Sequence, residues 1–115
     1  MIVRKDELHS EQRENMRGGE GMVTFTHLED AQQLSNGRLF ATLTLPPGSS
    51  IGPHAHEGET EYYYILRGTG EVAEADGTKQ VEPGDVVITG NGASHSISNT
   101  GDDTLEFVAL ILLDA

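Results

Sequence analysis

Residues 48–68 read GSSIGPHAHEGETEYYYILRG, and this stretch holds most of the residues from which the fold and a functional site can be predicted. His54 and His56 are two residues apart, so on an extended chain their imidazoles point to the same face. Glu61 follows five residues after His56, at the start of a tyrosine-rich apolar run. Neighbouring antiparallel strands lie about 4.8 Å apart, so Glu61 can reach the same point in space if the two segments pair.

A second segment, residues 84–99, reads GDVVITGNGASHSISN and places His95 after a glycine-rich bend. Three imidazoles and one carboxylate form a nitrogen and oxygen donor set suited to a divalent first-row transition metal. A His-x-His pair alone is weak evidence for such a site. Glu57 and Glu59 are alternatives to Glu61 as the acidic donor. We expect these two on a loop, whereas the strand that follows Glu61 sets the direction of its side chain, so we choose Glu61.

At these spacings the two segments together resemble the two sequence motifs of the cupin family. The first motif, which combines spaced glycines with His-x-His and a glutamate, is matched in full from Gly48 to Gly68. The second motif is matched from Gly84 to Asn99 with one departure, because Gly90 stands where the family usually has a proline. That departure affects a turn and none of the metal-ligand positions.

The resemblance implies an all-β protein with one cupin domain, a double-stranded β-helix or jelly-roll barrel. It also implies that His54, His56, Glu61 and His95 bind one divalent transition-metal ion per chain. Manganese, iron, nickel and zinc all remain open as the metal. In the family, such ions keep one or two coordination positions free for water, dioxygen or a chelating substrate.

The remainder of the chain also favours an all-β fold, because its 14 glycines separate short segments rich in β-branched and aromatic residues. The predicted strands are residues 22–27, 38–45, 60–67, 70–75, 78–81, 85–89, 95–98 and 104–113. Residues 1–20 are polar, and we expect an extended N-terminal arm there, followed by the barrel domain in residues 21–115. Residues 10–16 could form one or two helical turns, but they have no apolar face to hold such turns in place.

Charge and composition exclude several kinds of partner. The chain has 19 acidic and 7 basic residues, a net charge of −12 that repels nucleic acids and anionic membranes. It has no cysteine, which excludes disulfides, thiolate metal sites and cysteine nucleophiles. No apolar run approaches the roughly 20 residues of a membrane span, and the N-terminus has no apolar leader. We therefore expect a cytoplasmic protein with a small-molecule ligand and neither nucleic-acid nor membrane partners.

Two of the predicted strands, residues 60–67 and 104–113, carry apolar side chains on both faces. A strand with one face in solvent normally alternates between apolar and polar residues. A second covered face is explained most simply by a subunit interface, so we predict a homodimer. The alternative is that the N-terminal arm covers the outer face.

The reaction type stays open at the level of sequence. A metal with exchangeable positions can chelate and polarise an organic acid or a polyol, which permits dioxygenation, decarboxylation or isomerisation. We expect oxidoreductase, dioxygenase or lyase chemistry on a small polar metabolite. The alternatives are a non-catalytic, metal-assisted binding module and a sugar or sugar-phosphate isomerase.

Two further residues are candidates for the substrate pocket. Tyr63 shares the face of Glu61 and could line the cavity, the alternative being an ordinary core aromatic. Arg38 could bind a substrate carboxylate, the alternative being a surface residue at the start of a strand. Small cupins of this kind resemble proteins described as oxalate-decarboxylase-like or mannose-6-phosphate-isomerase-like. This chain has Ile51 where the oxalate decarboxylases keep an arginine, and its barrel is poor in the bases that a phosphate would need.

Overall fold

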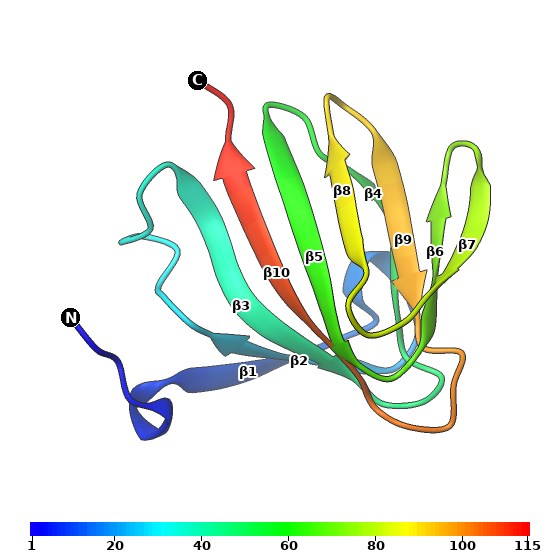
Figure 1. The fold of residues 1–115 in the computed structure, drawn as a ribbon, viewed down its shortest axis with the longest axis horizontal. Helices are drawn as coiled ribbons and strands as arrows, with labels where there is room; N and C mark the ends of the chain where they lie inside the picture. The colour runs from blue at the N-terminus through cyan, green and yellow to red at the C-terminus, as the bar shows by residue number, and fades with distance from the viewer.

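A computed structural model of residues 1–115 shows two antiparallel β-sheets that face each other, so the all-β prediction is confirmed (Figure 1). The first sheet has six strands in the order β1 (His9–Glu14), β2 (Met22–His27), β3 (Gly37–Leu45), β10 (Leu105–Leu113), β5 (Glu59–Arg67) and β8 (Val86–Gly90). The second has four strands in the order β4 (Ser50–Ala55), β9 (Ser94–Ser98), β6 (Gly70–Glu74) and β7 (Gly77–Val81). Two short 3-10 turns, η1 (Lys5–Glu7) and η2 (Met16–Gly18), flank β1. Neither is long or apolar enough to span a membrane.

The core lies between the two sheets and follows the two-residue period of the strands. On β10, the side chains of Leu105, Phe107 and Ala109 are buried, while those between them are only partly covered. The same alternation on β5 turns Glu61 and Tyr63 inward. The pattern that builds the core therefore also directs a carboxylate and a phenol into the interior.

Two strands, β1 and β4, were missed by the sequence prediction. β1 consists of polar, exposed residues and pairs in antiparallel register with β2, so most of residues 10–16 form an edge strand and not the helical turns that were considered for them. A polar edge strand gives no hydrophobic period, and only its backbone pairing specifies it. β4 contains Gly52 and Pro53, both poor strand formers, at an irregularity in its pairing with β9.

The outer face of the strands β10, β5 and β8 carries an apolar patch. Two rows cross these strands in register, one formed by Val108, Tyr64 and Val86 and the other by Leu110, Tyr62 and Ile88. Tyr64 and Ile88 are 48% and 59% exposed. β1 lies at the edge of the sheet opposite β8, so the arm does not cover this patch. We call these six residues the outer apolar patch.

Candidate metal centre

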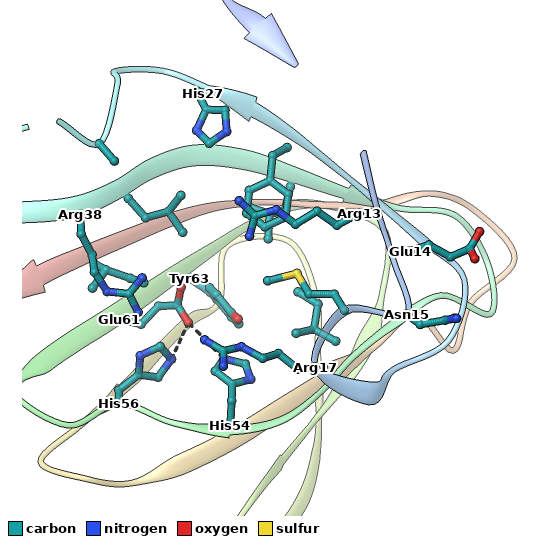
Figure 2. Close-up of a pocket in the computed structure, with 17 residues that line it drawn as sticks. Arg13, Glu14, Asn15, Arg17, His27, Arg38, His54, His56, Glu61 and Tyr63 are labelled. Carbon is teal, nitrogen blue, oxygen red and sulfur yellow. Dashed lines mark ion pairs between the residues drawn. The ribbon is translucent and has the colours of Figure 1, made fainter. Parts of the chain in front are cut away.

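Three strands bring the predicted metal ligands to one point. His54 on β4 lies directly opposite His95 on β9, while His56 follows the end of β4 and Glu61 lies on β5. The Nε2 atom of His95 is 3.1 Å from the Nε2 atoms of both His54 and His56, and 3.0 Å from Oε1 of Glu61. One ligand atom from each of the four residues lies within 4.8 Å of every other. Figure 2 shows His54, His56 and Glu61 turned toward this point.

Each imidazole is oriented by a hydrogen-bond partner on its other nitrogen. The Nδ1 contacts are 2.8 Å from His54 to the Gly52 carbonyl, 2.6 Å from His56 to Oε2 of Glu59 and 2.8 Å from His95 to Oγ1 of Thr89. A proton held on Nδ1 by such a partner leaves the Nε2 lone pair free to bind a metal. The Gly52 carbonyl and the Glu59 carboxylate can only accept, so His54 and His56 present Nε2 in the form that binds metal, and the Thr89 hydroxyl can accept from Nδ1 of His95 in the same way.

This donor set fits a divalent transition metal. His56, His95 and Glu61 are at most 4% exposed, so an ion among them would be shielded from water. Three imidazoles and one carboxylate supply a single negative charge, which offsets half the charge of a divalent cation, and this ligand mixture suits manganese, iron, nickel or zinc. The four residues could thus hold a metal ion.

The electrostatics of the centre favour an ionised Glu61. Burial opposes the charge on this carboxyl, but hydrogen bonding to His54 and His95 and the electrostatic effect of His56 lower its pKa to about 2. Burial also raises the pKa of the neighbouring Tyr63 phenol well above its usual value, and the Glu61 carboxylate adds to this effect. At neutral pH the pair is therefore a carboxylate beside a protonated phenol.

Glu59, which the sequence analysis did not choose as a metal ligand, also lies at the centre. It begins β5 rather than lying on a loop, and it is 7% exposed. Its Oε2 accepts the hydrogen bond from His56, and both its oxygens contact Arg38, at 2.6 Å from Nε and 2.7 Å from Nη2. The Arg38 guanidinium holds the pKa of this carboxyl at about 2. Residues 59, 61 and 63 share one face of the strand because side chains alternate with a two-residue period. That period was the sequence signal that could have placed Glu59 beside Glu61.

The two predicted pocket residues both lie at the cavity. Tyr63 stacks on His95 with ring centroids 5.0 Å apart and packs against Phe107 at 4.5 Å, so it is a core aromatic that also forms part of the cavity wall. Arg38 lines the cavity as well, but its guanidinium is engaged by Glu59. Its predicted contact with a substrate carboxylate stays a prediction.

A cavity of about 490 Å³ opens in front of the metal centre. Its apolar wall consists of Met16, Phe25, Ala31, Leu39, Leu43, Ile51 and Ile111. The N-terminal arm supplies Arg13 and Arg17 to the same cavity, and no sequence signal placed them there. We call residues 15–19, which carry Arg17, the strap.

Comparisons with known proteins agree with this architecture. A family model for the cupin domain matches residues 41–111. An oxalate-binding protein of Thermotoga maritima is 49% identical over 114 residues, which cover 98% of this chain and 94% of that protein. The crystal structure of a predicted oxalate decarboxylase from the same organism superposes with a TM-score of 0.92 at 48% identity, covering 98% of this chain and 99% of the other. A cupin-superfamily sugar phosphate isomerase from Silicibacter pomeroyi, with a TM-score of 0.79, 17% identity and coverage of 97% and 75%, shares the fold alone.

Proposed function

The chain belongs to the cupin family, and from this premise we propose that it binds one divalent transition-metal ion through His54, His56, Glu61 and His95 and uses that ion to bind a small organic acid. The observation that carries the proposal is the orientation of the imidazoles. All three have Nδ1 engaged by a protein oxygen and Nε2 directed at Oε1 of Glu61. Histidines buried only for packing have no reason to converge in this way.

The properties of the cavity favour a small anionic ligand. A bound divalent ion supplies Lewis-acid chemistry that polarises a chelated carboxylate. The residues of this chain hold the ligand and its surroundings. The protonated Tyr63 phenol is a hydrogen-bond donor at the cavity wall, and the apolar side chains restrict water. The oxalate-binding relative, at 49% identity, supports an organic acid in preference to a sugar phosphate.

The proposal has two candidate functions. In the first, the protein is an enzyme that converts this acid by oxidoreductase or lyase chemistry, and in the second, it binds the acid without turnover. One observation favours the second: both acidic side chains near the centre are already engaged, Glu61 by the histidines and Glu59 by Arg38 and His56. No carboxylate at the centre is left to act as a general base. Recovery of oxalate unchanged after long incubation with the metal-loaded protein would favour binding alone, whereas loss of oxalate would establish turnover.

The metal proposal is tested by elemental mass spectrometry on untagged protein. We expect close to one transition-metal ion per chain in the wild type, and loss of that ion in His54→Ala. His9→Ala is the matched control, because His9 is an exposed histidine on β1 that belongs neither to the four-residue cluster nor to the cavity lining. Oxalate should raise the melting temperature of the wild type only when metal is bound. A protein that takes up no metal even on reconstitution would contradict the proposal.

We also propose that the outer apolar patch is the interface of a homodimer. Its two rows span three strands and leave large apolar side chains in water, which is unusual for a monomer. Sedimentation velocity should show a dimer for the wild type and a monomer for Ile88→Glu. Gln12→Glu introduces the same charge at an exposed position on β1, at the edge of the sheet opposite β8, and should leave the dimer intact. A monomeric wild type would contradict the proposal.

A further inference from the structure

We propose that Arg17, carried by the strap, is the residue that binds the ligand's carboxylate charge in the cavity. The inference rests on the proposed function, because it concerns a ligand bound at the same metal centre. It assigns to the N-terminal arm a direct part in choosing the ligand.

The first observation is that Arg17 is the cavity arginine without a carboxylate partner. Three arginines line the cavity. Arg13 bonds to Glu11, with Nε 2.8 Å from Oε1, and Arg38 is held by both oxygens of Glu59. Arg17 forms no ion pair, although the chain has 19 acidic residues and only 7 basic ones. Figure 2 shows its side chain extending from the strap toward His54.

The second observation is the backbone conformation of the strap. Asn15 and Arg17 have φ angles of 51° and 55°, in the left-handed region that side chains other than glycine rarely adopt. Residues held in such conformations persist only where the surrounding structure imposes them, and they are concentrated at ligand-binding sites. A glycine would be the ordinary choice at position 17 if only the turn mattered, so the arginine side chain is retained for another reason.

The third observation is that the strap is fixed against the strand that carries His54. A Cβ atom on Gly52 would lie 2.0 Å from the Arg17 carbonyl oxygen, and one on Gly19 would lie 2.2 Å from the carbonyl oxygen of Ser50. The backbone nitrogen of Ser50 also donates to the Glu20 carbonyl at 2.8 Å. This close contact between backbones holds Arg17 in place relative to the metal centre.

The ligand chemistry follows from these positions. At the cavity wall β4 contributes Ile51 and the predicted metal ligand His54 but no arginine or lysine, so the free guanidinium comes from the strap. A guanidinium presents paired N–H donors that match the two oxygens of a carboxylate. A ligand that chelates the metal and still presents carboxylate oxygens to Arg17 meets both requirements. Small acids with two negative charges should therefore be preferred over analogues with one.

The test compares oxalate with oxamate, in which one carboxylate is replaced by a neutral amide. Calorimetric titrations would use the metal-loaded wild type, Arg17→Gly and Arg17→Lys. Glycine accepts a positive φ, so Arg17→Gly removes the guanidinium without straining the strap. Arg67→Ala is the control, since Arg67 pairs with Glu106 and lies outside the cavity lining.

We expect Arg17→Gly to bind oxalate about tenfold to hundredfold more weakly, the range for loss of a charge-assisted hydrogen bond. Oxamate binding should weaken less, metal content should stay unchanged, and Arg17→Lys should be intermediate. Wild-type affinity for oxalate in Arg17→Gly, an equal loss for both ligands, or loss of metal would overturn the assignment of Arg17. If the metal-loaded wild type itself does not bind oxalate, the proposed organic-acid ligand is wrong, and the role of Arg17 is overturned with it.

Discussion

The metal centre and the strap line the same cavity but are stabilised in different ways. The centre is buried, and hydrogen bonds between its three imidazoles and Gly52, Glu59 and Thr89 orient the rings. The strap is largely exposed, has two residues in the left-handed region, and is held by its backbone against β4. The centre is therefore a product of side-chain chemistry on regular strands, while the strap depends on one close contact between backbones.

The two regions suit two different roles within one cavity, metal binding and ligand choice. A metal site needs ligand atoms fixed to within a fraction of an ångström, and regular strands with satisfied hydrogen bonds provide that. Ligand choice needs a charge at the mouth of the cavity, which a short segment outside the barrel strands can carry. Homologous barrels could in this way keep the centre and change the strap.

Gly52 joins the two regions, and its substitution should have the largest effect. In Gly52→Ala the new Cβ would clash with the Arg17 carbonyl, and the Gly52 carbonyl that orients His54 would shift with it. We expect a loss of about 1–3 kcal/mol in the free energy of unfolding, the range for forced overpacking, together with weaker metal binding. Urea denaturation and metal titration measure the two effects.

Gly18→Ala is the matched control, because its φ of 79° strains the strap while its Cβ would meet no atom within 4 Å, so the Gly52 carbonyl that orients His54 stays in place. It should disturb the strap while metal affinity stays near that of the wild type. Equal metal affinity in Gly52→Ala and the wild type would show that the two regions are not coupled.

The parts of this molecule that follow a short-range pattern could be predicted from the sequence. Eight of the ten strands have a two-residue hydrophobic period or flanking glycines that mark them, and they lie close to the predicted ranges. β1 has no apolar face and β4 contains a proline, so neither has a local signal. Their positions depend on pairing with β2 and β9, which local sequence does not encode.

The same distinction applies to the site. The convergence of His54, His56, Glu61 and His95 could be predicted because their spacing matches a family motif on strands. Glu59 was assigned to a loop, although its place two residues before Glu61 put it on the same face. Arg17 had no signal at all, because its position in the cavity results from packing between residues far apart in the chain.

Glu59→Gln tests whether hydrogen bonding around the centre is as important as the comparison implies. Glutamine keeps the shape of the side chain but loses the charge that orients His56 and pairs with Arg38. Loss of such a partner typically lowers metal affinity about tenfold to hundredfold. Competition with a chelator of known affinity measures this. Glu57→Gln, an exposed neighbour, is the control and should bind metal as the wild type does. Unchanged affinity in Glu59→Gln would show that Gly52 and Thr89 suffice.

The stability that Glu59 contributes should depend on pH. The pKa of this carboxyl is about 2 in the folded protein, chiefly because of the Arg38 hydrogen bond, against a usual value of 4.5. A carboxyl with a lowered pKa stabilises the folded state above its unfolded pKa, and this contribution is lost as the pH falls toward the folded value. On metal-free protein, the advantage of the wild type over Glu59→Gln in urea denaturation should be full above about pH 5 and should shrink between pH 4.5 and 2. A constant difference across this range would contradict the assigned ion pair.

The smallest expected effect concerns the strap itself. At φ 55° a glycine avoids the steric cost that arginine bears, about 1–2 kcal/mol. Glycine in turn loses more entropy on folding, by roughly 0.5–1 kcal/mol. The free energy of unfolding of Arg17→Gly should therefore lie between that of the wild type and about 1.5 kcal/mol above it, measured in urea on metal-free protein. Asn15→Gly should gain less stability, because asparagine tolerates the left-handed region better than arginine.

A clear loss of stability in Arg17→Gly would mean that the arginine side chain supports the fold. A gain in stability combined with weaker oxalate binding would mean that the strained conformation of Arg17 lowers the stability of the protein, while its side chain contributes to ligand binding.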